Sequence, residues 1–181
     1  MATKAERPKY RVERISPKHD VSNFISPKKE LTEYLVEDAL EDQANKISVT
    51  YLLISDGDEV IGYFTLLNDS IRTANVKAKD VLDGYNYSSI PALKIGRLST
   101  KVGYEKRGLG TEMLVLSFSY MFKITRYSGC RIMLVDSKSD CPGFYEKFGF
   151  KRTSARRDRS IPMYMDGGTY LKELESEDDG R

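Results

Sequence analysis

The chain has 181 residues, of which 31% are charged and 40% are hydrophobic, and it contains no tryptophan. Length and composition are typical of one globular domain with a sizeable core. A formal net charge of +2 does not by itself indicate a nucleic-acid or membrane partner, because the distribution of charge matters more than its sum. No apolar stretch reaches bilayer-crossing length and the polar N-terminus has no signal-peptide core, so we expect a cytoplasmic protein without membrane contact.

The cysteines and the single histidine do not predict a metal site. The spacing of Cys130 and Cys141 is not that of metal ligands, and His19 lies far from both in sequence. We expect both cysteines to be reduced thiols and His19 to be an exposed loop residue. A nucleophilic Cys141 is a weak alternative, because the only histidine is remote from it in sequence.

The first half of the chain predicts a strand, an amphipathic helix and a hairpin. Ser26-Pro27 is a helix-entry signal, and apolar residues then recur at four-residue steps from Leu31 to Ala39. This pattern predicts a helix over about 28–46, with an acidic face turned to solvent. Two β-branched and aromatic runs flank an Asp-Gly turn, which is a hairpin signal. The predicted strands of this half are 10–15, 49–54 and 60–67.

The second half predicts strands that alternate with helices. Residues 68–92 have no clear pattern apart from a short helix expected over 76–82 and extended backbone at Ile90-Pro91. A long helix that is apolar almost all round is expected to be buried against a sheet. The expected elements are a strand at 93–100, the long helix at 109–126, a strand at 131–136, a helix at 142–148, a strand from 150 and a last strand within 161–171.

This order of elements predicts an α/β fold. Strand, turn, helix, strand, helix and strand form a βαβ core, which an antiparallel hairpin precedes. We therefore expect one domain over 9–171, built as a mixed sheet with helices on both faces. A flexible N-terminus is predicted at 1–8 and an acidic flexible tail at 172–181.

The turn before the long helix is the strongest local signal. Gly108 and Gly110 permit a tight turn and a close approach of a ligand, since neither carries a Cβ. The first amides of the helix have no internal partners and lie at the positive end of its dipole. Lys106 and Arg107 add positive charge, so the turn suits a phosphate or pyrophosphate. Ordinary turn chemistry remains an alternative at this point.

Three blocks, in this order, resemble the GNAT superfamily of acyl-CoA-dependent N-acetyltransferases. The blocks are 94–99, 105–111 and 143–150; the first two resemble the strand and pyrophosphate loop of that family, and the third its F-Y-x-x-x-G-F signature. The likeness covers roughly residues 10–170. It implies a mostly antiparallel sheet around a central βαβ core that binds acetyl-CoA, and direct transfer of the acetyl group to a primary amine without a metal.

The resemblance also implies the residues that hold the cosubstrate. The backbone of the strand is expected to pair with the pantetheine arm and the thioester carbonyl, where neighbouring strands splay apart. Glu105 departs from the family pattern, which has Gln or Arg there, and its carboxylate is expected to face the phosphates with a like charge. The implied acetyl-CoA-binding residues are Leu98, Ser99, Thr100, Glu105, Lys106, Arg107, Gly108, Leu109, Gly110 and Thr111.

Tyr145 matches the tyrosine that the family directs toward the sulfur of CoA. The resemblance therefore implies that Tyr145 is the general acid that protonates the leaving thiolate, since a tyrosine with a pKa of about 10 is protonated at neutral pH. The alternative is a packed aromatic residue beside Phe148. No general base is identified: Glu105, Asp136 and Asp140 are near only in sequence, and a water molecule is a further candidate.

A basic run is the candidate acceptor surface. Lys151 begins it, and five positive charges stand against one negative charge within nine residues. Such a run suits a nucleic-acid backbone, a solvated edge or the 3′-phosphate of CoA. The arginines assigned to the acceptor or RNA are Arg152, Arg156, Arg157 and Arg159.

The whole layout resembles the GNAT toxins of bacterial toxin–antitoxin pairs. Those proteins acetylate aminoacyl-tRNA and are neutralised by a small DNA-binding antitoxin, so the resemblance implies these two partners. A small amine or a protein amine as acceptor, and a homodimer, stay open. The rival function from another class is a non-catalytic CoA- or RNA-binding module with a GNAT-like fold.

Overall fold

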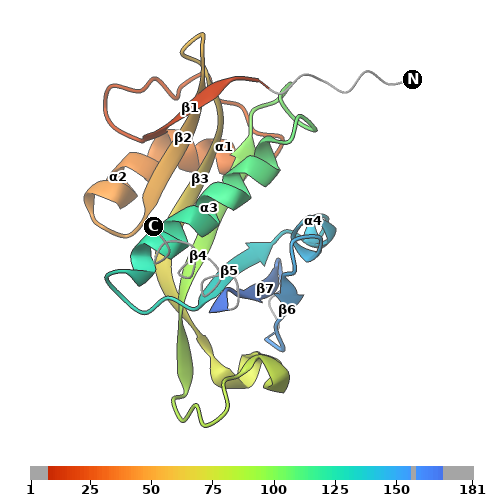
Figure 1. Cartoon of the computed structure of the whole chain (residues 1–181). Coiled ribbons are helices and arrows are strands. Elements are labelled where there is room, and N and C mark those ends of the chain that lie inside the picture. Colours follow the sequence, from red (N-terminus) through yellow and green to blue (C-terminus); the bar gives the residue numbers. More distant parts are fainter. Residues whose placement is uncertain (1–7, 156–157, 169–181) are drawn as a thin grey trace. The chain divides into compact units, whose positions relative to one another are not determined.

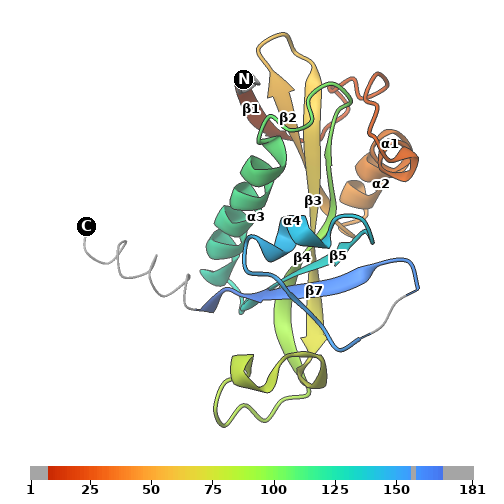
Figure 2. The ribbon, with the colours of Figure 1, turned by 90° about the vertical axis from the view of Figure 1, so that its right-hand side faces the viewer.

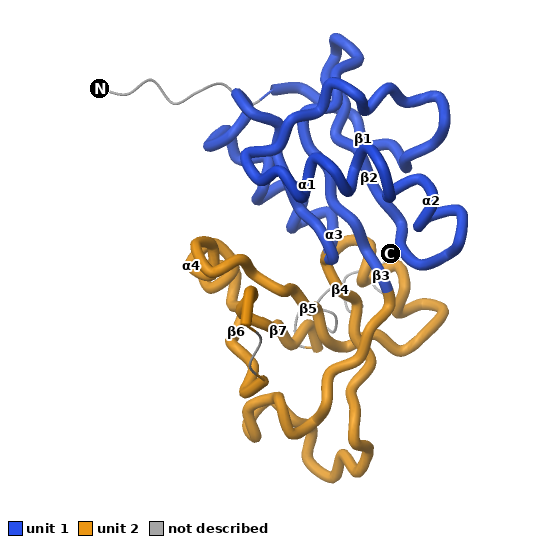
Figure 3. The backbone as a smooth tube through the Cα atoms, turned by 180° about the vertical axis from the view of Figure 1, so that it is seen from behind, with its two compact units in different colours: residues 1–67, 96–117 blue, residues 68–95, 118–181 orange. Residues whose placement is uncertain are grey.

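Figure 1 shows the computed structural model of the chain, which describes residues 8–155 and 158–168. Two compact units divide the chain (Figure 3): unit 1 comprises residues 1–67 and 96–117, and unit 2 comprises residues 68–95 and 118–181. Strands β3 and β4 and helix α3 contribute residues to both units. Of the flexible N-terminus expected at 1–8, only Pro8 is among the described residues. The tail expected at 172–181 lies outside them, and the domain bounds 9–171 stay a prediction.

Seven strands form one sheet in the order β1-β2-β3-β4-β5-β7-β6. β4 and β5 are parallel, and the pairs β1–β2, β2–β3, β5–β7 and β6–β7 are antiparallel. The predicted mixed, mostly antiparallel α/β sheet is therefore confirmed. The strands are β1 (Tyr10–Arg14), β2 (Val49–Ser55), β3 (Val60–Arg72), β4 (Ser89–Thr100), β5 (Ile132–Ser137), β6 (Lys151–Arg152) and β7 (Ile161–Asp166).

The helical elements follow the predicted order with altered bounds. Within unit 1, α1 and α2 lie on one side of β2 and β3 and the first half of α3 lies on the other (Figure 2). The short helix expected over 76–82 is reduced to the single 3₁₀ turn η3, and a second 3₁₀ turn, η2, precedes this segment. The elements are α1 (Lys29–Glu33), η1 (Tyr34–Asp38), α2 (Ala39–Ala44), η2 (Thr73–Asn75), η3 (Ala78–Asp80), α3 (Leu109–Thr125) and α4 (Pro142–Glu146).

The helix expected over 28–46 is interrupted by η1, a five-residue π-helical segment. Apolar residues at four-residue steps drift by about 40° per step on an α-helix, which has 3.6 residues per turn. A wider π turn offsets this drift, and it keeps Leu31, Leu35 and Ala39 directed at the same core. Leu35 and Ala39 are fully buried there with Leu52 and Tyr63.

In unit 2, residues from the β3–β4 connection cover one face of the sheet. Val76, with the partly buried Val81 and Tyr85, packs on Ile132, Leu134 and Tyr164. A polar cluster fixes this cover: the carboxylate of Asp80 accepts hydrogen bonds from Lys151 Nζ at 2.7 and 2.8 Å and from Tyr164 Oη at 2.6 Å. The segment without a sequence pattern therefore takes its shape from contacts with β6 and β7.

We expect Asp80→Asn to lower the free energy of unfolding by about 2 kcal/mol, since it removes charge-assisted hydrogen bonds at a mostly buried carboxylate. Burial alone raises the pKa of Asp80, but hydrogen bonds from Lys151 and Tyr164 and the charge of Lys151 outweigh it, so the pKa lies below its ordinary value of 3.8. The contribution is thus fully present above about pH 4 and is lost as the pH falls through the lowered pKa.

Chemical denaturation of the wild type and Asp80→Asn between pH 2 and 7 measures this effect. The stability difference should narrow below about pH 4. Exposed Asp83, in the same connection, supplies the control Asp83→Asn, which should leave stability within about 0.5 kcal/mol of the wild type. A stability difference between the wild type and Asp80→Asn that does not change with pH would show that the ionised Asp80 carboxylate does not stabilise the fold.

Candidate active site

The end of β4 is free of its parallel neighbour. The ladder between β4 and β5 joins Ala92–Ile95 to Ile132–Val135 and stops there, although β4 continues to Thr100. The segment Leu98–Thr100 therefore has no ladder partner on β5. The pairing of this backbone with a pantetheine arm stays a prediction.

Contacts within unit 1 hold this end of β4 in place. Ser99 is buried, and its hydroxyl donates to Ser26 Oγ at 2.8 Å. Val102 N donates to Ile25 O at 2.8 Å, and Lys101 N donates to the backbone oxygen of the β3 residue Ile61 at 2.9 Å. The predicted thioester-binding segment is thus anchored from both sides before the chain enters the turn.

The turn itself uses left-handed backbone at three positions. Gly103, Lys106 and Gly108 have φ angles of +88°, +61° and +86°. Glu105 caps the turn, because its Oε2 accepts the Gly103 N–H at 2.7 Å. Its effect on bound phosphates stays a prediction.

Helix α3 begins where the turn ends. Glu112 N donates to Gly108 O at 3.1 Å as the first bond of the helix, so the amides of Leu109, Gly110 and Thr111 precede the helical hydrogen-bond ladder. These donors lie at the positive end of the dipole of α3, which has 17 residues. The geometry fits a pyrophosphate, which the backbone N–H groups would bind.

One carboxylate that the sequence did not single out connects this turn to the β2–β3 hairpin. Glu59 accepts hydrogen bonds from Lys101 Nζ at 2.7 Å and from Tyr104 Oη at 2.7 Å. Hydrogen bonds from these two partners hold the pKa of Glu59 below its usual value. The ring of Tyr104 lies under the Arg107 guanidinium, 5.1 Å from ring centroid to Cζ. Because the partners are more than 40 residues apart, no local pattern points to them.

We expect Glu59→Gln to weaken acetyl-CoA binding by about threefold and to lower stability by no more than about 1 kcal/mol, since a half-exposed ion pair contributes little. Calorimetric titration with acetyl-CoA and thermal melting measure the two effects. Asp56→Asn, at an exposed residue of the same hairpin turn, is the control. Equal affinities for the wild type and Glu59→Gln would show that Glu59 does not set the shape of the loop.

Tyr145 lies in α4, within unit 2, and 8% of it is exposed. Its ring meets Phe144 and Phe150 edge-on at centroid distances of 5.0 and 5.5 Å, rather than Phe148. Burial, with a smaller effect from Cys141, raises the pKa of Tyr145 above its ordinary value of 10.0. No hydrogen bond to the Tyr145 hydroxyl is formed by any residue that the structure describes. The phenol is therefore protonated at neutral pH with its donor unused.

The other candidate groups of unit 2 have partners. Asp136 forms an ion pair with Lys94 at 2.7 Å, and Asp140 lies 3.5 Å from the exposed Cys141 Sγ. Cys130 is a buried free thiol, and burial raises its pKa to about 11. No one carboxylate stands out as a general base.

The basic run is only partly described. Arg152 pairs with Glu146 at 3.0 Å, Arg159 is exposed, and Arg156 and Arg157 lie outside the described residues. The predicted site residues thus fall in two groups: the acetyl-CoA set lies in unit 1, and Tyr145, Arg152 and Arg159 lie in unit 2.

In unit 1, His19 is not the exposed loop residue expected. Its side chain is 8% exposed and its ring bonds to Ser16 N at 3.0 Å and to Glu13 at 3.0 Å. Across the described residues, no cluster of three or more His, Cys, Asp or Glu side chains could hold a metal ion. Within the same residues, no helix has the length and apolar character that a bilayer crossing requires.

No protein-family model matches the chain. A tRNA-acetylating toxin of Mycobacterium tuberculosis is 27% identical over 139 residues, covering 76% of this chain and 82% of the toxin. The structure of AtaT complexed with acetyl-methionyl-tRNAfMet has 18% identity and a TM-score of 0.82, covering 92% of this chain and 99% of AtaT. A mutant AtaT toxin bound to the C-terminus of the antitoxin AtaR and acetyl-CoA has 17% identity and a TM-score of 0.73, covering 92% and 97%.

These likenesses define the class of fold. The chain has the GNAT fold over nearly all of its length, as the three sequence blocks imply. Among proteins with this fold, the chain is similar to a tRNA-acetylating toxin and to the toxin AtaT.

Proposed function

We propose that this protein transfers the acetyl group of acetyl-CoA to the amino group of an aminoacyl-tRNA. The observation that carries the proposal is the likeness to a tRNA-acetylating toxin along most of both chains, joined to a turn whose free amides fit a pyrophosphate. A structure with the same fold holds acetyl-methionyl-tRNAfMet, and another holds acetyl-CoA. Both ligands belong to those proteins, and we assign the same two substrate classes to this chain.

The chemistry requires three contributions from the protein. The amides at the start of α3, with Gly108 left-handed before them, bind the pyrophosphate. The backbone of Leu98–Thr100 holds and polarises the thioester carbonyl. The neutral amine attacks that carbonyl, the C–N bond forms and the C–S bond breaks. Tyr145 donates its hydroxyl proton to the departing thiolate, and the amine proton passes to water.

The likeness to AtaT suggests a protein partner, and the substrates of the reaction suggest its location. Because the AtaT toxin binds the C-terminus of an antitoxin, we include an antitoxin protein among the partners of this chain. Aminoacyl-tRNA and acetyl-CoA occur together in the cytoplasm, so we place the reaction there. A small amine or a protein amine is the competing acceptor class.

Thermal melting with and without acetyl-CoA, followed by incubation with labelled acetyl-CoA and bulk aminoacylated tRNA, tests the proposal. A ligand that binds only the folded state raises the melting temperature. We expect an upward shift and label in acid-precipitable RNA, and no label when the tRNA is first deacylated. A shift without label in RNA would overturn the acceptor, and no shift at a large excess would overturn the acetyltransferase.

A further inference from the structure

A column of aromatic side chains joins β3 to α1 and η1, within unit 1. Phe24 meets Tyr63 edge-on at 5.4 Å, and Tyr63 stacks on Tyr34 at 6.5 Å, both between ring centroids. The guanidinium of Arg97 lies over the Tyr34 ring, 4.5 Å from its centroid. The three rings are buried, whereas Arg97 is exposed. The aromatic column therefore ends in a cation at the surface.

The aromatic column is held rigidly. Tyr63 Oη donates to a backbone oxygen of α1 at 2.6 Å. Tyr34 Oη donates to Asp42 at 3.1 Å and shares a hydrogen bond with Ser48 at 3.0 Å. Tyr34 is also the first residue of the π-helical segment, and such segments are frequent at functional sites. Arg97 thus rests on a ring that cannot move freely, which reduces the cost of ordering it around a ligand.

Most donors of Arg97 remain available. A guanidinium carries five N–H donors, and here one bonds to Gly96 O at 2.9 Å. Within residues 8–155 and 158–168, no carboxylate lies within ion-pair distance of Arg97. Three arginines with carboxylate partners differ from it: Arg11, Arg131 and Arg152 pair with Asp58, Asp166 and Glu146. Arg97 is therefore a pre-oriented cation with open hydrogen-bonding capacity.

Arg97 also lies close to the segment where we place acyl transfer. Arg97 and Ser99 are two residues apart in β4, so their side chains share a face and their Cα atoms are about 6.6 Å apart. Ser99 contacts Ser26, just before α1, which confirms that this face turns toward the N-terminal helices. In an aminoacyl-tRNA, the phosphate of the terminal nucleotide is one ribose away from the ester that bears the reacting amine.

We propose that Arg97 binds a phosphodiester at the acceptor end of the nucleic acid and thereby positions the aminoacyl amine beside Leu98–Thr100. The inference rests on the proposed function and adds a binding residue on unit 1 to the basic run on unit 2. A planar guanidinium fork matches two phosphate oxygens, and stacking on Tyr34 fixes the plane of the fork.

Two acceptors separate this role from a structural one. Arg97→Gln removes the charge, and we expect the KM for aminoacyl-tRNA to rise about tenfold while the KM for acetyl-CoA is unchanged. The slope of log(kcat/KM) against log salt should become shallower by about 0.7, the value of one phosphate contact on a single strand. With an aminoacyl-adenosine that carries no phosphate, wild type and Arg97→Gln should react equally.

Two further variants complete the test. Arg97→Lys keeps the charge but not the fork, and we expect an intermediate KM for aminoacyl-tRNA. Lys29→Gln changes net charge equally, at a residue of α1 that is 87% exposed and already paired with Glu33, and should leave the KM unchanged. An unchanged KM in Arg97→Gln, or an equal loss on both acceptors, would overturn the role of Arg97. Absence of any wild-type reaction with aminoacyl-tRNA would instead overturn the proposed function.

Discussion

We expect Tyr145→Phe to lower the rate constant of acetyl transfer at least tenfold, in line with the typical 10²–10⁴-fold contribution of a positioned acid. Folding should be retained, since the ring contacts with Phe144 and Phe150 do not involve the hydroxyl. No hydrogen bond to this hydroxyl is formed by the described residues. Its removal should therefore leave the melting temperature unchanged or slightly raised.

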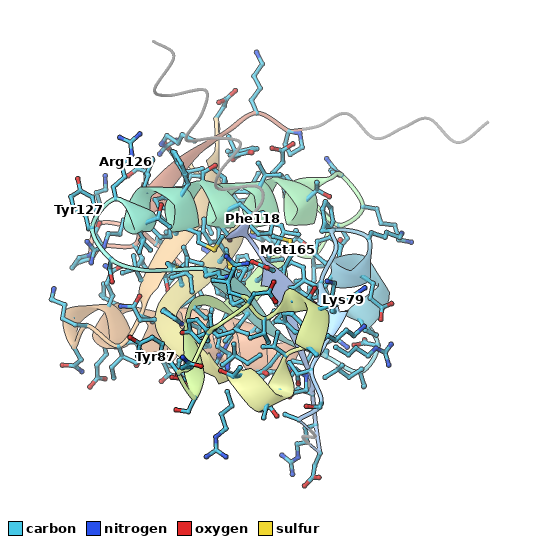
Figure 4. All side chains as sticks on the ribbon, turned by 60° about the horizontal axis from the view of Figure 1, so that its bottom comes forward. Lys79, Tyr87, Phe118, Arg126, Tyr127 and Met165 are labelled. Carbon is cyan, nitrogen blue, oxygen red and sulfur yellow. The ribbon has the colours of Figure 1, made fainter. Side chains whose placement is uncertain are left out.

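Single-turnover measurements with saturating acetyl-CoA isolate this step. Tyr127→Phe removes a hydroxyl from a tyrosine of unit 2 that is 92% exposed, just beyond the end of α3 (Figure 4), and should react like the wild type. Because burial raises the pKa of Tyr145, its proton should stay in place beyond the ordinary tyrosine pKa of about 10. Between pH 7 and 9, deprotonation of Tyr145 should therefore not lower the wild-type rate. The rates of the wild type and of Tyr145→Phe should change with pH in the same way over this range. Equal rates for wild type and Tyr145→Phe would remove Tyr145 from the mechanism.

The second large effect is expected at Gly108, where φ is +86°. A Cβ at this position costs about 1–2 kcal/mol in left-handed backbone and stands beside the free amides of α3. We expect Gly108→Ala to weaken acetyl-CoA binding at least tenfold, because either the loop changes shape or the Cβ blocks the pyrophosphate. Titration calorimetry measures the dissociation constant directly.

Gly103 offers a matched control for backbone strain. Its φ is +88°, and an added Cβ would meet no atom within 4 Å. Gly103→Ala should therefore lower the melting temperature about as much as Gly108→Ala, but leave the affinity for acetyl-CoA within about twofold. If both variants lose affinity for acetyl-CoA equally, strain in the turn explains the effect. The pyrophosphate would then not be bound by the amides that follow Gly108.

The elements with a clear period were predictable from the sequence. β1, β2, α3 and β5 begin and end within a few residues of their predicted bounds, because side-chain alternation or an apolar run defines each of them. The apolar helix α3 is buried through Leu109, Met113, Leu114 and Met121. The turn at Gly108 was also visible, since glycine is the residue that left-handed backbone favours.

Contacts between residues distant in sequence were not predictable. Asp80 meets Tyr164, 84 residues away, and Glu59 meets Tyr104, 45 residues away, so neither partner belongs to a local pattern. The bond that Glu105 accepts from the Gly103 amide was not predictable for a related reason, since it depends on the φ angles of the turn. The four-residue steps from Leu31 to Ala39 could have indicated the π-helical segment, because an α-helix does not keep such steps on one face.

The most direct test of the central claim is the identity of the acetylated atom. After incubation with acetyl-CoA and a single purified aminoacyl-tRNA, mild alkali releases the amino acid from its ester, and mass spectrometry reads its mass. We predict an amino acid heavier by one acetyl group on its α-amine, formed by the wild type and strongly reduced in Tyr145→Phe. An unmodified amino acid, with acetyl found on the RNA bases or nowhere, would contradict the proposed acceptor.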